Sequence, residues 1–446
     1  MAQVTVVGGG LSGSEAAYQL AERGHDVTLH EMRPVRGTPA HHTDRLAEVV
    51  CTNSFKSLDP QNAHGLLKTE MRALGSLLLR MADESRVPGG TALVVDRDEF
   101  SQRMTDAIHA HPRIRVVREE VTALPAGPTI IATGPLTSDA LSESIRGALG
   151  VEGLAFFDAI APILSYESLD HEVLFAASRW GKGEGDDYLN APFTREQYNA
   201  FIEALKGAES YEGHDWEKVP YFEGCLPIEV MAGRGPDTLR FGPMKPVGLR
   251  VPQWNGARAH AILQLRREDR AGQMWNLVGF QTRLKIPEQK RIFQMIPGLE
   301  NAEFLRYGSI HRNTYLNFPA RLSAHGSLRD REDLLFAGQI TGVEGYTEST
   351  AVGILAAVNV DRIVRGEEPT IPPPTTMIGG LMRYLRDANP AAFQPMNSNF
   401  GLLDPLAETV KDKHRKRELL VDRARADFAA WMAENGVESA EGAGVA

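Results

Sequence analysis

A short strand that runs straight into a glycine pattern constrains this chain most. Residues 3–7 are rich in β-branched side chains, and Gly8, Gly10 and Gly13 follow at once as G-x-G-x-x-G. Gly8 permits a tight turn, Gly10 lets a pyrophosphate approach the backbone, and Gly13 lets the following helix lie close to the strand. The pattern predicts a β-α-β unit that binds a nucleotide.

The next residues complete this unit. Residues 12–23 carry small and apolar side chains at helical spacing, Gly24 ends that helix, and residues 27–31 form a second strand. Glu31 closes this strand, where a carboxylate accepts a hydrogen bond from a ribose hydroxyl. The glycine pattern alone also occurs in structural turns and in sites for other nucleotides such as S-adenosylmethionine. The strand, the helix and the acidic residue together favour an adenine dinucleotide.

Two later segments favour FAD over NAD. Residues 129–132 form a strand-like run that ends in Thr133 and Gly134, a small pair that can pass under a cofactor. Residues 334–339 form another strand, which leads through a glycine-rich loop to a helix beginning near Thr347. The positive end of that helix dipole would face the flavin. Either segment alone is compatible with an ordinary buried strand, but their order along the chain favours an FAD-binding domain.

The predicted fold is therefore α/β. A Rossmann-like FAD-binding domain, similar to that of glutathione reductase, is interrupted by a smaller α+β insertion domain. The FAD-binding domain takes residues 1–165 and 305–435, including a C-terminal helix from about residue 406 to 434. The insertion domain takes residues 166–304, where the periodicity is irregular and aromatic residues, glycine and proline are frequent. Residues 436–446 are small and acidic, and we expect a disordered tail there.

Charge and cysteine content limit how the chain can bind nucleic acid and which redox compartment suits it. The net charge of −10 means that any nucleic acid must bind to a local basic patch. The two cysteines, Cys51 and Cys225, form no C-x-x-C pair, which excludes a dithiol reductase and is typical of a reducing cytoplasm. No cluster at zinc spacing, no secretory signal and no apolar run near the ~20 residues of a membrane span is present.

Six segments stand out along the chain: GGGLSGSEAA (8–17), CTNSFKS (51–57), FEGCLPIE (222–229), GPMKPVGL (242–249), AGQITGVEGY (337–346) and MNSNFGLL (396–403). Together they resemble a known family, the bacterial folate- and FAD-dependent tRNA (uracil-5-)-methyltransferases. The first and fifth segments also resemble the larger FAD-dependent tRNA wobble-uridine modification proteins, whereas the second and third, each of which contains a cysteine, do not. Thr52 departs from the serine expected at its position.

The resemblance implies a reaction. Methylenetetrahydrofolate would supply a one-carbon unit, FAD reduced by NAD(P)H would supply electrons, and the product would be 5-methyluridine at position 54 in the T-loop of tRNA. The chain has no second G-x-G-x-x-G for NAD(P)H, which fits transient docking of the nicotinamide at the flavin. The alternatives are an FAD oxidoreductase acting on a small metabolite, a relative that modifies wobble uridine, and a non-catalytic flavin-binding RNA protein.

Chemistry at uracil C5 requires a strong nucleophile that can also leave. A thiolate added at C6 turns C5 into an enolate carbon that attacks a methylene iminium. Cys225, between Gly224 and Pro227, is the expected nucleophile. Cys51, in a polar loop, is expected beside the flavin, to remove the C5 proton or to protect a reactive flavin adduct. Tyr346 is expected to contact the flavin or to take part in proton transfer, and ordinary packing is the alternative for each of the three.

Further residues are expected to contact folate, tRNA or FAD. The resemblance implies that His311 stacks on the folate pterin, while Arg283 and Lys285 would meet phosphate or folate glutamates. Lys411 begins a basic run over residues 411–425 that, with a second run over 258–270, would bind tRNA phosphates, although such runs are more often solvated helix faces. The expected FAD-binding residues are Gly8, Gly9, Gly10, Leu11, Ser12, Gly13, Glu31, Met32, Arg33, Thr133, Gly134, Gly338, Gln339, Glu348 and Ala351.

Overall fold

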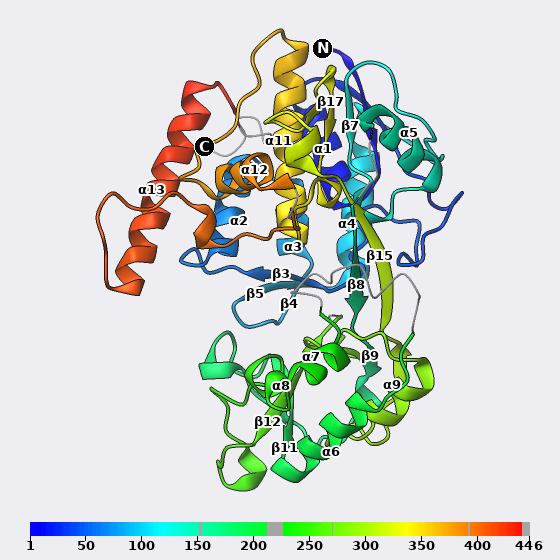
Figure 1. The fold of residues 1–446 in the computed structure, drawn as a ribbon, viewed down its shortest axis with the longest axis vertical. Helices are drawn as coiled ribbons and strands as arrows, with labels where there is room; N and C mark the ends of the chain where they lie inside the picture. Colours follow the sequence, from blue (N-terminus) through cyan, green and yellow to red (C-terminus); the bar gives the residue numbers. More distant parts are fainter. Residues whose placement is uncertain (151–153, 212–225, 270, 391–392, 439–446) are drawn as a thin grey trace.

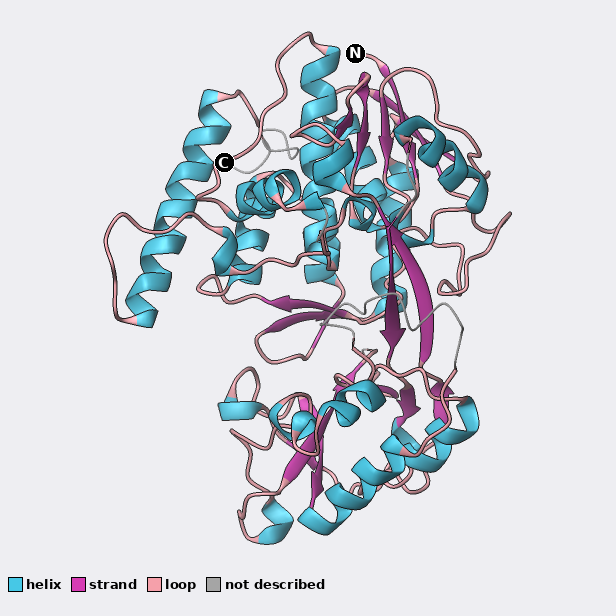
Figure 2. Cartoon of the chain, in the orientation of Figure 1, coloured by secondary structure: helices cyan, strands magenta, loops and turns pink. Residues whose placement is uncertain are grey.

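The computed structural model describes residues 1–150, 154–211, 226–269, 271–390 and 393–438. A larger α/β part and a smaller part lie at opposite ends of two long strands (Figure 1). These strands are β8 (Leu154–Ile160) and β15 (Ser309–Tyr315), which pair with each other in antiparallel register. Figure 2 shows the same pair as the connection between the two parts.

The larger part is built on a six-stranded sheet in the order β16-β17-β7-β1-β2-β6. Every neighbouring pair is parallel except β16 with β17. Because β1 pairs with β2 on one side and with β7 on the other, the strand order reverses at β1, and ligands of α/β sheets bind at such a point. The strands are β1 (Gln3–Val7), β2 (Asp26–His30), β6 (Ile114–Val117), β7 (Thr129–Ile131), β16 (Ser327–Leu328) and β17 (Arg331–Phe336).

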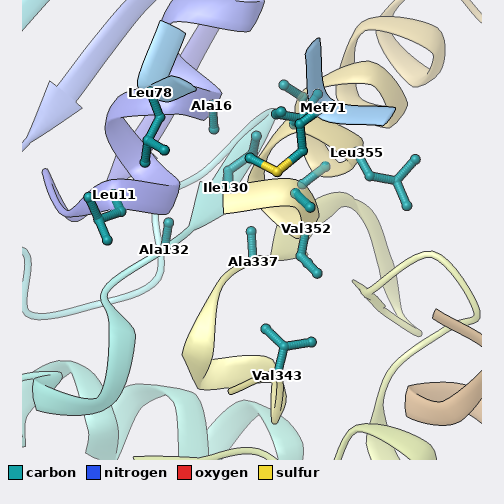
Figure 3. Close-up of a cluster of buried hydrophobic side chains, with 14 of the residues drawn as sticks. Leu11, Ala16, Met71, Leu78, Ile130, Ala132, Ala337, Val343, Val352 and Leu355 are labelled. Atoms are coloured by element: carbon teal, nitrogen blue, oxygen red, sulfur yellow. The ribbon is translucent and has the colours of Figure 1, made fainter. Parts of the chain in front are cut away.

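Helices α1 (Leu11–Glu22) and α11 (Tyr346–Val364) pack tightly against each other. A Cβ on Gly353 of α11 would lie 2.6 Å from the main-chain oxygen of Ser12, so only glycine allows this approach. Figure 3 shows Ala16 of α1 in the same apolar cluster as Val352 of α11. This packing places the first turn of α1 beside α11.

Residues 65–81, where leucines and alanines recur at helical spacing, belong to two helices, α2 (Ala63–Ala73) and α3 (Leu77–Glu84). Gly75 between them has a φ of 71°, which helical residues do not adopt. Ser76 then caps α3, because its hydroxyl accepts a hydrogen bond from the N–H of Leu79 at 3.4 Å. A glycine followed by a serine was the sequence signal for this break.

Most other predicted elements of the larger part are confirmed within a few residues. The last helix is shorter than predicted, since α13 (Lys413–Glu434) begins where the Asp412 side chain accepts the N–H of Arg415. The remaining helices of this part are α4 (Arg97–Ala110), α5 (Asp139–Leu149), α10 (Phe318–Arg321) and α12 (Met377–Asp387), and a small sheet joins β3 (Ser54–Ser57), β5 (Ala92–Val95) and β4 (Arg86–Val87).

The smaller part contains a second six-stranded sheet in the order β10-β11-β12-β13-β9-β14. Its apolar core is separate from that of the larger part. Its strands are β9 (Ile163–Ser165), β10 (Phe175–Ala176), β11 (Tyr188–Phe193), β12 (Ala261–Arg267), β13 (Met274–Leu277) and β14 (Phe304–Arg306), and its helices are α6 (Arg195–Lys206), α7 (Ile228–Arg234), α8 (Thr238–Phe241) and α9 (Ile286–Phe293).

We propose that this smaller part is the insertion domain, with boundaries near residues 165 and 304 as predicted. Of the tail predicted at residues 436–446, residues 439–446 lie outside the described residues, while Val437 is buried against the core of the larger part. Among the described helices, none is long and apolar enough to cross a membrane.

Candidate active site

A cleft opens beyond the carboxyl ends of β1, β2 and β7. It holds about 1030 Å³ of space, part of it open to solvent, which suits a ligand as long as a dinucleotide. Eleven predicted site residues line it: Gly8, Gly10, Leu11, Ser12, Glu31, Met32, Arg33, Thr133, Gly134, Gln339 and Tyr346.

The three glycines of the motif differ in what surrounds them. A Cβ on Gly8, whose φ is +104°, would lie 2.6 Å from the oxygen of Ala132, and a Cβ on Gly13 would lie 1.8 Å from the oxygen of Gly8. By contrast, a Cβ on Gly10 would meet nothing within 4 Å and would extend into the cleft. Gly8 and Gly13 therefore allow the strand, turn and helix to pack, and Gly10 leaves space for a ligand next to the backbone.

The start of α1 has the features of a phosphate site. No side chain among the described residues caps this helix, so its first N–H groups are free to bind an anion. The hydroxyl of Ser12 is buried and has no hydrogen-bond partner in the described chain. Because buried hydroxyls are nearly always hydrogen-bonded, this one is available to bond to a ligand at the start of α1. The residues present thus fit the pyrophosphate of a dinucleotide.

Glu31 is held in place from two directions. Its carboxylate accepts the N–H of Gly9 at 2.9 Å, and it accepts the N–H and the Nε–H of Arg33 at 3.0 and 2.9 Å. Burial alone would raise the pKa of Glu31, but the hydrogen bonds and charge of Arg33 outweigh it and lower that pKa. Glu31 therefore presents a fixed negative charge at the cleft, with lone pairs left for a ribose hydroxyl.

The loop after β2 adds lining residues that sequence reasoning missed. His41 bonds through Nδ1 to the hydroxyl of Thr38 at 2.6 Å, and both residues line the cleft. Burial, together with the charge of Arg33, lowers the pKa of His41 to about 4, so its ring is neutral at pH 7. Glu48 also lines the cleft and accepts a hydrogen bond from Arg33 at 3.1 Å. The loop has no periodic pattern, so no sequence signal distinguished these residues.

The start of α11 forms the other end of the cleft, where Tyr346 and Ser349 line it. Three residues predicted to bind the cofactor lie behind this surface instead. A Cβ on Gly338 would be 2.8 Å from the Cβ of Ser12, and Ala351 is fully buried. Glu348 is fully buried as well, where it accepts the N–H and hydroxyl of Ser398 at 3.0 and 2.6 Å. Gly9 and Gly13 likewise serve packing rather than line the cleft.

Tyr346 joins the cleft to the loop that carries Cys51. The Tyr346 hydroxyl accepts the N–H of Cys51 at 2.8 Å and the N–H of Thr52 at 3.2 Å. Burial raises the pKa of Tyr346, and the neighbouring Cys51 raises it further, so the hydroxyl is protonated and can still donate one hydrogen bond. The Cys51 thiol is half-buried and not in a disulfide. The structure therefore brings these two predicted residues together.

We expect Tyr346→Phe to loosen the Cys51 loop. The substitution leaves two N–H groups without an acceptor, at a cost of about 1–3 kcal/mol for each one that water cannot reach. Thermal denaturation should occur at lower temperature, and alkylation of Cys51, followed by mass spectrometry, should become faster. Tyr384→Phe is the matched control, since its hydroxyl donates to the oxygen of Gln394 at 2.6 Å and has no bond to the Cys51 loop. Equal alkylation rates in both variants would contradict this role.

Among the other predicted catalytic and substrate residues, Arg283 and Lys285 are described with their side chains, and neither lines the cleft. Cys225 lies outside the described residues, and for His311 the structure gives the backbone position on β15, opposite Asp158 of β8. Lys285 forms an ion pair with Glu209 at 2.8 Å. The N–H of Arg283 donates to Glu229 at 2.9 Å, and its guanidinium lies 3.7 Å from the same carboxylate. Both cations thus already face a carboxylate.

The two predicted basic runs differ in how far their side chains are exposed to solvent. Lys411 and residues 413–417 are exposed, at and before the start of α13, as a phosphate-binding surface requires. In the second run, Arg266 is only 8% exposed and donates to Thr52 and Asn53 at 2.5 and 3.0 Å. The prediction that Arg266 belongs to a surface patch is therefore wrong, because the strand β12 turns this side chain towards the Cys51 loop.

Comparison with known proteins identifies a matching family model and relatives that are similar over nearly the whole chain. The family model described as glucose inhibited division protein A matches residues 3–368. A curated protein of Geobacter sulfurreducens named methylenetetrahydrofolate–tRNA-(uracil-5-)-methyltransferase TrmFO is 54% identical over 431 residues, which cover 96% of this chain and 99% of that protein. The protein of the same name in Anoxybacillus flavithermus is 53% identical over 422 residues, which cover 95% of this chain and 97% of that protein.

Among solved structures, Aquifex aeolicus GidA in its form II crystal has a TM-score of 0.68 with 17% sequence identity. The match covers 98% of this chain and 74% of that one. At this identity the likeness concerns the fold alone. Together with the parallel sheet and its glycine-rich turn, it confirms the predicted Rossmann-like α/β fold.

Proposed function

Because this chain belongs to the glucose inhibited division protein A family and, within it, to the TrmFO methylenetetrahydrofolate–tRNA-(uracil-5-)-methyltransferases, we propose that it methylates C5 of the T-loop uridine U54 in tRNA. The carbon comes from 5,10-methylenetetrahydrofolate, and FAD reduced by NAD(P)H provides the electrons. The observation that carries the proposal is the identity of 54% over 96% of the chain. As its substrate is tRNA, we place the enzyme in the cytoplasm.

FAD, when bound, supplies the electrons that reduce the transferred carbon to a methyl group. The first turn of α1 and the Ser12 hydroxyl would hold the pyrophosphate, and Glu31 would hold a ribose hydroxyl. The N-terminus of α11, at the other end of the cleft, would hold the ring system, where its dipole would stabilise negative charge by about 0.3–1 kcal/mol. These roles rest on the lining of the cleft and on the unpaired hydroxyl in it.

We propose that two thiols act on the base, Cys225 as the nucleophile and Cys51 as the group that removes a proton. The Cys225 thiolate adds to uracil C6, which makes C5 nucleophilic enough to bond to the methylene carbon of the folate. Cys51 then accepts the C5 proton, and the electron pair of that C–H bond expels tetrahydrofolate and leaves a methylene group on C5. A hydride equivalent from reduced FAD would convert this methylene to a methyl group, and the electron pair returned to the ring expels the Cys225 thiolate, which restores the C5–C6 double bond. Tyr346 keeps the backbone of Cys51 in place through its two hydrogen bonds. The proximity of Cys51, Tyr346 and the cleft supports this division.

Transfer RNA must reach this site in spite of the chain's charge of −10. We propose that Lys411 and the exposed cations of 413–417 bind backbone phosphates, so that affinity falls steeply with salt. The target base is flipped out of the tRNA elbow to reach the thiols, as in other enzymes that act on bases.

Incubation with ¹⁴C-labelled methylenetetrahydrofolate, NADPH and an unmodified tRNA transcript tests the proposal. Label should appear on C5 of U54 and should disappear when the transcript carries cytidine at that position. Consumption of NADPH without labelled tRNA would favour an oxidoreductase acting on a small metabolite. Transfer of a methyl group from S-adenosylmethionine would also contradict the proposed function.

A further inference from the structure

Three arginines from three separate elements converge behind the Cys51 loop. Arg97 is the first residue of α4, Arg266 lies on β12 of the smaller part, and Arg306 ends β14. Arg97 donates through Nη1 to the oxygen of Val49 at 2.5 Å, just before Cys51 in the chain. Arg266 binds Thr52 and Asn53, just after Cys51. The thiol-bearing loop thus lies against buried guanidinium groups contributed by both parts of the molecule.

Among the described residues, the contacts of this cluster show more positive than negative charge. Glu268, fully buried, forms an ion pair with Arg97 and acts electrostatically on all three arginines. Three buried or half-buried cations thus lie around this buried anion. Burial lowers the pKa of Arg266 and of Arg306, and the charge of Arg97 lowers both further. Such an excess of buried positive charge favours an anionic ligand.

Two of these groups have hydrogen-bonding capacity to spare. The Nη2 of Arg97 is buried without a partner, and the side chain of Arg97 as a whole is 15% exposed. The Arg306 guanidinium has no hydrogen bond or ion pair to any described residue, although Cys51, Tyr346 and Arg97 are within electrostatic range. Arg97 bonds to the Cys51 loop at Val49, and Arg306 lies within electrostatic range of Arg97, Cys51 and Tyr346, so the unused donors lie on the same side of this loop.

We propose that Arg97 and Arg306 form an oxyanion site for the uracil ring. This proposal rests on the proposed function. When a thiolate adds to C6, the new S–C6 bond displaces the C5–C6 π pair, and the negative charge moves from sulfur to a ring carbonyl oxygen as an enolate. The two guanidinium groups donate to that oxygen, and Arg266 positions the loop through Thr52 and Asn53.

A ring carbonyl suits this site better than other oxyanions of the reaction. The Arg97 side chain is only 15% exposed, and the edge of a flat, flipped-out base enters so enclosed a site more readily than a phosphate within an RNA backbone. A guanidinium fork also matches planar acceptors. A folate carboxylate would share the same chemistry, and the experiment distinguishes these sources.

The variants to compare are Arg306→Met and Arg306→Lys, measured as holoenzyme with saturating tRNA and folate. Removal of one oxyanion donor should lower the single-turnover rate of methyl transfer about 100-fold, with partial recovery in the lysine variant. The KM for folate and the Kd for tRNA should stay within about threefold, as should the rate of FAD reduction by NADPH, because these steps do not need the enolate. Since Arg306 bonds to no described residue, its loss breaks no ion pair within the described part of the chain.

Arg103→Met is the matched control, because Arg103 lies on the same helix as Arg97 but pairs with Glu84 and Glu99 at the surface. Its methyl-transfer rate should equal that of the unmodified chain. A rise in the KM for folate or in the Kd for tRNA at an unchanged rate in Arg306→Met would overturn the uracil assignment, and so would an unchanged rate with unchanged binding. If the unmodified chain itself transferred no methyl group, the proposed function would fail first. Arg97→Lys is an independent second variant, in which the FAD content is checked before the same single-turnover rate of methyl transfer is measured.

Discussion

Gly13→Ala should purify as a colourless protein that binds FAD poorly. The new Cβ would lie 1.8 Å from the main-chain oxygen and 3.0 Å from the carbonyl carbon of Gly8. Both are backbone atoms of the phosphate-binding turn, so no side-chain rotation relieves the collision. The first turn of α1 must then move away from β1, and its packing against α11 resists that movement. Overpacking of this kind costs about 3 kcal/mol, which corresponds to roughly 100-fold weaker binding.

Flavin absorbance of the purified protein and a fluorescence titration with FAD would measure this effect, with thermal denaturation alongside. Gly147→Ala is the matched control, because Gly147 lies inside α5 with no atom within 4 Å of a new Cβ. That substitution should leave FAD binding unchanged and stabilise the helix by about 0.5–1 kcal/mol. A yellow Gly13→Ala protein with normal thermal stability would show that the turn tolerates a side chain.

Local patterns along the chain predicted much of the nucleotide-binding half correctly. The strand, glycine turn and helix at the N-terminus have backbone requirements that few other residues satisfy, so the sequence shows them directly. The helix beginning near residue 347 is also confirmed, as α11 begins at Tyr346. These features depend on residues that are close together in the chain, where periodicity and glycine placement carry the information.

What the sequence could not show depends on contacts between distant segments. Arg266 looks like part of a basic run, but its partners Thr52 and Asn53 lie more than 200 residues away. Charge patterning along the chain cannot show which side of a strand is buried. Glu348, which stays a predicted cofactor contact, is fully buried and accepts a hydrogen bond from the Ser398 hydroxyl. In each case the partner comes from another segment, which the pattern along the chain does not show.

Cys225→Ala should abolish methylation while the protein stays yellow. Alanine has no group that can add to uracil C6, so the loss should exceed about 10³-fold and should not respond to higher substrate concentration. FAD binding should be normal, because the substitution leaves unchanged the described residues that line the cleft and would hold FAD. The labelled-folate assay measures the first effect, and the flavin spectrum measures the second.

Cys51→Ala is the matched comparison, because the chain has only these two cysteines. A tRNA with 5-fluorouridine at position 54 separates their roles, since fluorine at C5 leaves no proton for a base to remove. Addition of the nucleophile and of the carbon can still occur, so a covalent protein–tRNA adduct should accumulate in Cys51→Ala as in the unmodified chain. Gel mobility under denaturing conditions would detect this adduct. Cys225→Ala should form none, and an adduct in that variant would transfer the role of nucleophile to Cys51.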